Sequence, residues 1–443
     1  SEPSVAAVND SGLVQAKKDG TALIYATTVN GLVASCNVTV DGYTNTIIRP
    51  DDVPTGYAGE DWTSFYDSSK VIVISNTPAD DLSQDEKAEM NKQAKKNLIT
   101  YAKKVGWTIY VDGMIDMSEG MLPSGTSGNS TSKLDAFVAA NSSYSTYKAY
   151  NNDKLSASSA QGEWTNPLNS KYRNNVVFSV ADKTAIIGIG SSSGIKGGGI
   201  NISSSYVVLR NLVIQDGFDP FPNHELKSDG TSDGWNAQVD AIAVGGGSHV
   251  WIDHCTLEDT VSLGTAPNGE KFQTYDGLCD ITKGSKYVTV SNCILRNHDK
   301  TMLIGSSKTD TGGGCITLSD NRFYGCGQRL PLTCVANMHI YNNYYGGQSG
   351  FYSNSYAIGA RYSVYTIIAE GNFFGTYISD AFKASTDPSG TCYARGNSSN
   401  SGSLSTTSSK PFSVPYEYEL LSYNEAKTYV TENAGAGVWT VKQ

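Results

Sequence analysis

The sequence predicts an all-β protein whose main part is a right-handed parallel β-helix, a solenoid in which successive coils stack on one another. Two observations carry this prediction. Glycine and tyrosine are abundant, and Ser, Thr and Asn are common between short apolar runs, which favours strands and turns over helix bundles. One strand template also recurs through residues 206–370 at short intervals, as the coils of a solenoid do.

The recurring template is a short alternating strand that ends at a polar turn. Its copies start 43, 38, 28, 22 and 28 residues apart, so the shortest coil has about 22 residues and the others carry loop insertions. The six copies start at Tyr206, His249, Tyr287, Cys315, Asn337 and Tyr365. A polar residue recurs at the turn after each strand, and we expect these side chains to stack in a ladder: Asn211, His254, Asn292, Asp320 and Asn342.

The first 41 residues have a different pattern, in which apolar and polar residues alternate around three glycines. Five apolar residues are expected to point inward: Val14, Leu23, Tyr25, Leu32 and Val38. Segments 5–14 and 20–27 resemble bacterial Ig-like modules, with the first strand missing. We therefore expect two domains, a partial Ig-like β-sandwich over 1–41 and a parallel β-helix over 42–443 that holds the chemistry. The alternative for 1–41 is a β-rich leader.

A few peripheral helices are also expected. Residues 82–106 have helical periodicity, and Ser83 with Glu86 forms a capping box at their start. Segment 119–175 is rich in Ser, Asn and Gly and is expected to form long loops. The tail contains a second helical pattern over 423–433, which should pack on the outside of the solenoid.

The charge of the chain limits its partners. The net charge of −10 and the isoelectric point near 5.0 argue against nucleic acid, which rewards a basic surface. An acidic protein that binds an acidic polymer must confine its positive charge to one groove. The sequence has no apolar run of about 18 residues, so no membrane span is expected. The chain does not begin with Met and shows no signal peptide, so we expect a processed chain.

The eight cysteines are too few for a disulfide scaffold in a chain of this size. Four lie in strand-like runs and are expected to be small buried hydrophobic residues: Cys255, Cys279, Cys293 and Cys315. Three others lie in turn-rich sequence, where a disulfide could form but no pairing can be assigned: Cys326, Cys334 and Cys392. The spacing of cysteine and histidine does not indicate a zinc site.

The candidate site combines carboxylates with cations. Asp276 and Asp280 offer hard oxygen ligands of the kind that Ca²⁺ takes, and Lys300 follows one coil later. Asp240, Asp280 and Arg329 precede the strands of their coils by nine, seven and eight residues, so they should face the same side. With strands about 4.8 Å apart, the step from Asp240 to Arg329 spans roughly 14 Å, enough for a few sugar rings. A metal beside a lysine suits a substrate that carries carboxylates.

Each of these residues also has an ordinary structural interpretation. A single Asp in a turn is most often a capping residue, Lys300 alone would be a solvated charge, and Arg329 could hold a loop. Their common position in the repeat favours the functional interpretation of the set. His254 and His298 lie at turn positions and are expected to have structural roles.

The chain resembles the pectate lyase family of parallel β-helix polysaccharide lyases over roughly residues 70–443. The motifs that carry the resemblance are Gly194-Ile-Lys-Gly-Gly-Gly, Asp240-Ala-Ile, Trp251-Ile-Asp-His, Asp276-Gly-Leu-Cys-Asp-Ile, His298-Asp-Lys-Thr-Met-Leu-Ile-Gly, Arg329-Leu-Pro, His339-Ile-Tyr-Asn-Asn-Tyr-Tyr, and Tyr356-Ala-Ile-Gly with Arg361. The resemblance implies a calcium site formed by Asp240, Asp276 and Asp280. It also implies that Lys300 holds a substrate carboxylate and that Arg329 is the base.

The chain departs from the family pattern at two positions. Cys334 stands where the family motif has a second Arg, so one substrate contact is expected to be missing or supplied elsewhere. Gln238 stands where some relatives have an acidic residue, which makes a site with several calcium ions less secure. Restoring Cys334→Arg is expected to lower KM.

The function that we expect is calcium-dependent cleavage of de-esterified α-1,4-polygalacturonate by β-elimination, by a secreted and monomeric enzyme that could be held at the cell surface. A pectin lyase acting on methyl-esterified polymer is one alternative, although its neutral substrate gives no use for the aspartates. A β-helix hydrolase would need a general acid and an activated water, and that pair cannot be assigned. A non-catalytic wall-binding or adhesin module is the third alternative.

Overall fold

The computed structural model describes residues 5–8, 14–16, 20–28, 32–40, 47–122, 130–158, 162–261, 272–310, 312–346, 350, 352–362, 365–384, 390–398 and 405–442. The chain divides into two compact units, residues 1–48 with Lys442, and residues 49–441. The boundary that we place after residue 41 stays a prediction.

The first unit contains two antiparallel ribbons, formed by β1 (Ala6–Val8) with β2 (Val14–Ala16) and by β3 (Gly20–Thr27) with β4 (Val33–Val40), and the short strand β5 (Ile47–Ile48). Strand β1 pairs with β2, and β3 pairs with β4 along its whole length. The apolar cluster consists of Val5, Ala6 and Ala22, with Val38 and Val40 packed against it. Three of the five residues expected to point inward are instead exposed, so that prediction is wrong for them: Val14, Tyr25 and Leu32. The Ig-like assignment stays a prediction.

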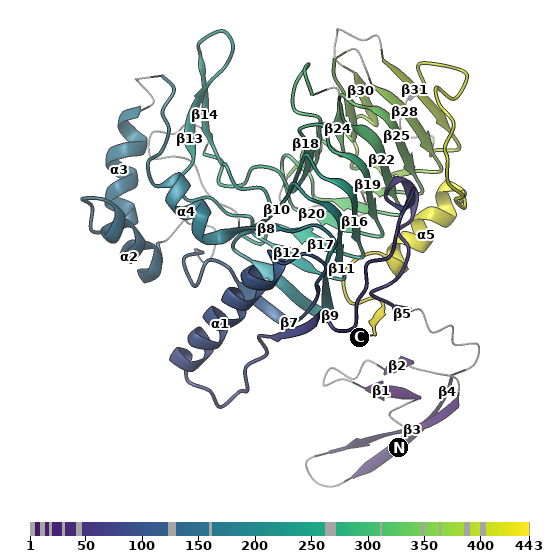
Figure 1. The fold of residues 1–443 in the computed structure, drawn as a ribbon. Helices are drawn as coiled ribbons and strands as arrows, with labels where there is room; N and C mark the ends of the chain where they lie inside the picture. Colours follow the sequence, from purple (N-terminus) through teal and green to yellow (C-terminus); the bar gives the residue numbers. More distant parts are fainter. Residues whose placement is uncertain are drawn as a thin grey trace. The chain divides into compact units, whose positions relative to one another are not determined.

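The second unit is the predicted parallel β-helix, in which strands of successive coils stack in parallel (Figure 1). One face is a sheet of eight strands: β8 (Val177–Val180), β10 (Gly199–Ile202), β15 (Ile242–Gly245), β18 (Cys279–Thr282), β21 (Leu303–Ile304), β24 (Leu332–Thr333), β27 (Ile358–Ala360) and β30 (Phe382–Ala384). We call it the site sheet.

Two further faces belong to one sheet, because the long strand β9 (Thr184–Lys196) pairs with β11 near its start and with β12 near its end. The longer arm contains β11 (Ser205–Arg210), β16 (Ser248–Asp253), β19 (Lys286–Ser291), β22 (Gly314–Ser319), β25 (Ala336–Tyr341), β28 (Thr366–Glu370) and β31 (Thr391–Arg395). The shorter arm contains β12 (Val213–Gln215), β17 (Thr256–Glu258), β20 (Ile294–Arg296), β23 (Arg322–Tyr324), β26 (Tyr344–Tyr345) and β29 (Phe373–Phe374).

The six predicted copies of the template are the strands from β11 to β28 of the longer arm, so the repeat is confirmed. Their inward residues stack in register: Val207, Val250, Val288, Ile316, Met338 and Ile367. All six are fully buried. Burial of one such side chain contributes about 1.5–3 kcal/mol, so this interior column holds neighbouring coils together.

The turn ladder lies one residue later than we expected. The predicted positions, such as Asn211 and Asn292, instead have left-handed backbone, with φ near +50°. Asparagine and aspartate tolerate this conformation better than most residues, which explains why polar residues recur there. The hydrogen-bonded amide stack runs through the next residues of the later coils: Asn321, Asn343, Asn372 and Asn397.

Helices pack around the solenoid. Helix α1 (Gln84–Ala102) has the predicted Ser83–Glu86 capping box and buries Leu98 against the first coil, beside β6 (Val71–Ser75) and β7 (Thr108–Asp116). Helix α5 (Tyr423–Asn433) begins and ends as predicted and buries Val430 beside Tyr344 on the shorter arm (Figure 1). Two short elements complete the unit: η1 (Gly56–Gly59) and β32 (Thr440–Val441).

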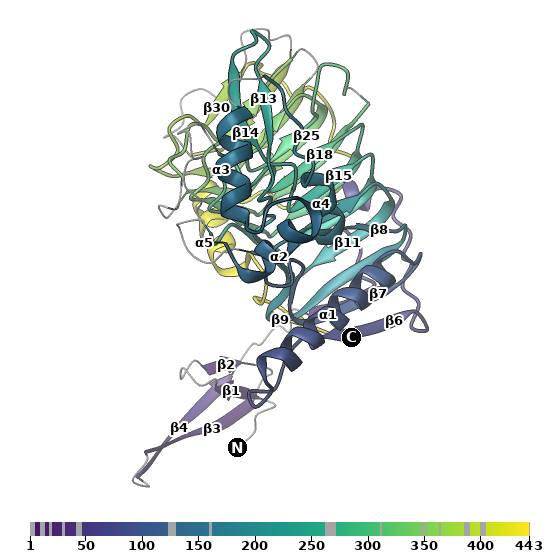
Figure 2. The ribbon, with the colours of Figure 1, turned by 90° about the vertical axis from the view of Figure 1, so that its left-hand side faces the viewer.

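The prediction of long loops over 119–175 is wrong. This segment contains α2 (Ser132–Asn141), α3 (Tyr147–Ser158) and α4 (Asn169–Val176). The helices pack around the buried ring of Phe221, which contacts Tyr147, Tyr150 and Tyr172 at centroid distances of 5.7–5.8 Å. Both views show them next to the hairpin of β13 (Asn223–Leu226) and β14 (Ser232–Asn236) (Figures 1 and 2).

The cysteines are free thiols in the described structure. Those expected in the core are fully buried, except Cys315, which is partly exposed. Cys326, Cys334 and Cys392 are buried without disulfides. Within the described ranges, none of the helices combines the length and the apolar character that crossing a membrane requires.

Candidate active site

The register of the site sheet places the candidate residues. Asp240 lies three residues before Ala243, and Lys300 and Arg329 lie three residues before Leu303 and Leu332. Ala243 pairs with Asp280, and Leu303 pairs with Leu332, so Asp240 and Arg329 stand at equal distances before their strands. Lys300 bridges with Gln328, the residue just before Arg329. The common position that we predicted is therefore right for Asp240 and Arg329.

Asp280 does not share the position in the repeat that we predicted for it, because it pairs with Ala243 and does not lie opposite Asp240. Its side chain nevertheless reaches the others through Gly277. A Cβ at Gly277 would lie 2.4 Å from Cγ of Asp280, so only glycine leaves room for this carboxylate. The backbone N–H of Gly277 donates to Oδ1 of Asp240 at 2.8 Å. Gly277 therefore leaves room for one aspartate and forms a hydrogen bond with the other.

A local irregularity directs Arg329. Lys300 forms a bridge with Gln328, whereas Leu303 pairs with Leu332, so the later coil holds one extra residue between these pairs. A bulge of this kind changes the direction of a side chain. Arg329 lies at the bulge and has a left-handed backbone, with a φ of +62°. Its buried Nε has no hydrogen-bond partner among the described residues.

Two of the aspartates lack enough nearby positive charge to balance their ionised form. Burial and the neighbouring Asp276 raise the pKa of Asp240 to about 7. Burial, followed by the charges of Asp240 and Asp276, raises the pKa of Asp280 well above its usual range, although Arg329 acts in the opposite direction. These mutual effects place all three carboxylates and Arg329 in one electrostatic cluster, which favours a bound cation.

Lys300 lies within this cluster and is almost fully buried. Its Nζ donates to Oδ1 of Asp276 at 2.6 Å and to Oδ1 of Asn236 at 2.7 Å. The amide of Asn236 donates in turn to Glu225, which also accepts a bond from the amide of Gln238. Asn236 and Glu225 belong to the β13–β14 hairpin, whose role the sequence did not reveal because no repeat or motif marks it.

The two histidines have structural surroundings, as predicted. His298 is fully buried, and its Nδ1 lies 2.8 Å from Asp259 while its Nε2 lies 2.9 Å from the carbonyl oxygen of Asp276. It therefore supports the backbone behind the carboxylates. His254 follows β16 on the longer arm, and its ring contacts Trp439 at 4.6 Å.

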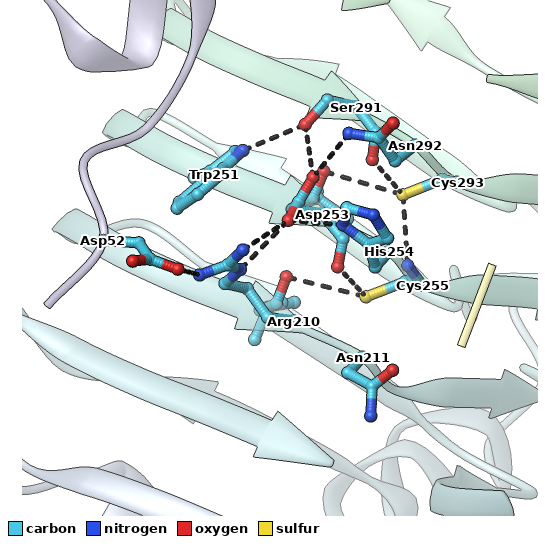
Figure 3. A network of polar contacts seen from close by, with 12 residues as sticks. Asp52, Arg210, Asn211, Trp251, Asp253, His254, Cys255, Ser291, Asn292 and Cys293 are labelled. Carbon is cyan, nitrogen blue, oxygen red and sulfur yellow. Dashed lines mark hydrogen bonds and ion pairs between the residues drawn. The ribbon is translucent and has the colours of Figure 1, made fainter. Parts of the chain in front are cut away.

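Figure 3 shows the network that holds His254. Asp253 accepts hydrogen bonds from His254, Arg210 and Ser291 at 2.7–3.0 Å, and Arg210 extends the network to Asp52. Although burial acts to raise the pKa of Asp253, His254 and Arg210 hold it well below its usual range. The network joins an early segment of the unit to three strands of the longer arm, β11, β16 and β19, so its role is structural.

The side chains of this cluster have the type of ligand atom that a hard cation binds. Asp240, Asp276 and Asp280 provide carboxylate oxygens, and the raised pKa of two of them shows that positive charge is short there. Their arrangement is not that of a closed metal site: the described residues contain no group of three or more His, Cys, Asp or Glu side chains placed to hold a metal. Lys300 occupies the place beside Asp276 instead.

Cys334 lies in the core and is 1% exposed, at the end of β24. Thr333 pairs with Ala360, so Arg361 follows in the next coil at the position beside Cys334. Its positive charge acts on the thiol, although burial has the larger effect and raises the pKa of Cys334. A guanidinium is therefore present next to the position where the motif's second Arg is missing.

Comparison with known proteins places the chain in a family. A family model described as pectate lyase matches residues 128–439. Over 299 residues the chain is 33% identical to pectate lyase A of Dickeya chrysanthemi, covering 62% of this chain and 74% of that protein. The chain belongs to the pectate lyase family. The parallel β-helix of the second unit is thus the fold of a pectate lyase family member.

Other relatives agree. The chain is 35% identical over 263 residues to a pectate lyase of Bacillus subtilis, covering 57% of this chain but 61% of that protein. The match with pectate lyase E of Dickeya chrysanthemi spans half of that protein. Among solved structures, a variant Bacillus subtilis pectate lyase superposes with a TM-score of 0.69 at 26% identity, covering 90% of this chain and all of the other. A pectate lyase bound to a hexasaccharide gives 0.68 at 26% identity, covering 88% and 99%.

Proposed function

We propose that this chain is a calcium-dependent pectate lyase that cleaves de-esterified polygalacturonate by β-elimination and releases 4,5-unsaturated oligogalacturonates. The observation that carries the proposal is the convergence of three carboxylates, Lys300 and Arg329 on the outer side of the site sheet. Membership of the pectate lyase family supports the same reaction.

The difficult step is removal of the weakly acidic proton on carbon 5 of a uronate sugar. Ca²⁺ held by Asp240, Asp276 and Asp280 would act as a Lewis acid on the uronate carboxylate. Lys300 would leave Asp276 and pair with that carboxylate, where its charge stabilises the enolate-like charge that develops. The amide oxygen of Asn236 keeps the ammonium in place during this exchange.

Arg329 would take the proton from carbon 5. A guanidinium is a poor base by its solution pKa, above about 12. The bulge that aims Arg329 and its unpartnered Nε support a role toward the substrate rather than in the fold. The second possibility is that Arg329 stabilises the intermediate while hydroxide removes the proton.

The alternatives fit the site less well. A pectin lyase would act on a methyl-esterified polymer. That polymer is neutral and has no carboxylates to pair with the positive charges of Lys300 and Arg329. A non-catalytic wall-binding module would not need a bulge to direct Arg329 into the carboxylate cluster. Secretion and a monomeric state accord with a polymeric substrate outside the cell and remain part of this proposal.

The test is the ultraviolet absorbance of unsaturated product formed from polygalacturonate, compared with methyl-esterified pectin. We expect product from polygalacturonate only, and only when calcium is present. Product from the esterified polymer in excess chelator would instead favour the pectin lyase.

A further inference from the structure

Glu225 and Gln238 lie next to the site, and the proposed reaction gives them no role. Glu225 belongs to the β13–β14 hairpin, in which Asn223 pairs with Asn236 and Glu225 pairs with Gly234. Residues two apart on a strand point to the same face, so Glu225 and Asn236 are diagonal neighbours on one face of the hairpin. Glu225 is therefore placed to act on the residue that binds the ammonium of the site.

The amide of Asn236 can bind Lys300 in only one of its two orientations. An ammonium only donates hydrogen bonds, so Nζ of Lys300 needs the amide oxygen, and the amide NH₂ must then find an acceptor elsewhere. That acceptor is Glu225, whose Oε2 lies 3.2 Å from Nδ2 of Asn236. If the amide were reversed, its NH₂ would face the ammonium and its oxygen would face the carboxylate. Glu225 and Lys300 therefore favour the same orientation.

Glu225 is itself held by a neutral amide. Nε2 of Gln238 donates to Oε1 of Glu225 at 3.1 Å, and the backbone N–H of Gln238 donates to Asp219 at 2.8 Å. Asp219 is fully buried and also accepts a hydrogen bond from Asn169 of α4 at 2.6 Å. An amide fixes a carboxylate without neutralising it. An ionised acidic residue in place of Gln238 could not donate to Glu225, which gives a structural reason for the glutamine at this position.

The position of Lys300 matters because this residue must change partners in the proposed reaction. Its ammonium leaves Asp276 for the substrate carboxylate, and the hydrogen bond to Asn236 is the contact that can persist through this exchange. A lysine side chain is flexible, so one fixed acceptor restricts the positions that its ammonium can take. Misplacement of a charged group by a fraction of its hydrogen-bond length is costly in a reaction that depends on alignment.

We propose that Glu225 is a positioning residue of this site, which acts on Lys300 through Asn236. Its carboxylate sets the orientation of the Asn236 amide and so directs the ammonium toward the carboxylate of the reacting sugar, while Gln238 holds Glu225 in place. The inference rests on the proposed function. It also gives the hairpin a part in the reaction, although the hairpin lies outside the repeat.

The first experiment compares Glu225→Met with the wild type on polygalacturonate, with Glu89→Met, an exposed residue of α1, as the matched control. Loss of the acceptor should lower kcat/KM about three- to tenfold, and the control should keep it. Glu225→Gln, which keeps an acceptor oxygen, should recover most of that loss. A value within about twofold of the wild type in Glu225→Met, or equal losses in the Met and Gln variants, overturns the proposal.

Glu225 is partly exposed, so its replacement should leave the fold intact, which the Tm of each variant checks. If Glu225→Met fails to fold, Gln238→Leu decides, because it removes the donor that holds Glu225 in place. An unchanged kcat/KM in that variant overturns the proposal.

A double-mutant cycle on binding separates this role from the reaction itself. All its variants carry Arg329→Lys, so that the polymer stays intact in calcium, and binding is measured by affinity electrophoresis in gels containing polygalacturonate. Glu225→Met should weaken retardation when Lys300 is present and have no further effect beside Lys300→Met. Equal effects in both backgrounds overturn the proposal. If the wild type forms no unsaturated product but this coupling is found, the proposed reaction fails and the positioning role stands.

Discussion

Nζ of Lys300 lies 2.6 Å from Oδ1 of Asp276, and the lysine side chain is only 8% exposed. This pair neutralises one of the three clustered carboxylates and leaves Asp240 and Asp280 without a full counter-charge. A divalent cation bound to the carboxylates would satisfy all three and free the ammonium for the substrate. The pair therefore links cation binding to the availability of Lys300.

Calcium should stabilise the folded protein through these carboxylates. Ligand at a hundredfold excess over its Kd adds about 2.7 kcal/mol to the free energy of unfolding, so the Tm of the wild type should rise measurably with calcium. Asp280→Asn should lose most of that rise, whereas Asp67→Asn, an exposed turn residue, should keep it. Equal calcium-dependent shifts in Asp280→Asn and the wild type would exclude this aspartate as a ligand.

Arg329→Lys should separate chemistry from binding. The charge is kept but the planar fork is lost, so kcat should fall by orders of magnitude while binding of polygalacturonate stays nearly intact. Arg322→Lys, on the shorter arm, provides the matched control and should retain activity. A variant within about threefold of the wild type, or ~0.7 kcal/mol in the barrier, would remove Arg329 from the mechanism.

Cys334→Arg should destabilise the protein rather than improve substrate binding, contrary to the expectation from the motif alone. Cys334 is buried, and a Cβ at Gly305 would lie 2.4 Å from its Sγ, so the site has no room for a longer side chain. The new charge would also meet Arg361. We expect a loss of about 2–4 kcal/mol, measured by denaturant unfolding. A stable variant with lower KM would show that the missing Arg had not been replaced.

The C-terminal tail should respond to acid through Glu370. Burial acts to raise its pKa, but His339, whose Nε2 lies 3.7 Å away, and hydrogen bonds from Lys410 and Tyr418 lower it to about 2. A carboxyl with a depressed folded-state pKa contributes stability that is present above its ordinary pKa and is lost as pH falls toward 2. Glu370→Gln should therefore lower stability by about 1–3 kcal/mol at pH 7, and the difference should shrink between pH 4.5 and 2. A constant difference across this range would contradict the assignment.

The sequence predicted the parts of the fold that rest on repetition. Strands from β11 to β28 follow one template, and stacked interior residues such as Val250 and Val288 enforce it in each coil. The helices α2 to α4 were missed because their own sequence is rich in Ser and Asn. Their stability comes from packing around Phe221, which lies far along the chain.

The candidate site could be predicted by position but not in its geometry. The common position of Asp240 and Arg329 follows from the repeat, whereas the approach of Asp280 depends on Gly277 and on the local path of the backbone. Asn236 was not singled out as a site residue, because packing of the β13–β14 hairpin brings it to Lys300. Motif matching identified residue types, but only the register shows that Arg361 stands beside Cys334.

The central claim is calcium-dependent β-elimination, and the most direct test follows ultraviolet absorbance on polygalacturonate with and without a chelator. The wild type should form unsaturated product in calcium, lose this activity in excess chelator and recover it when calcium is restored. Full activity in excess chelator would contradict the account.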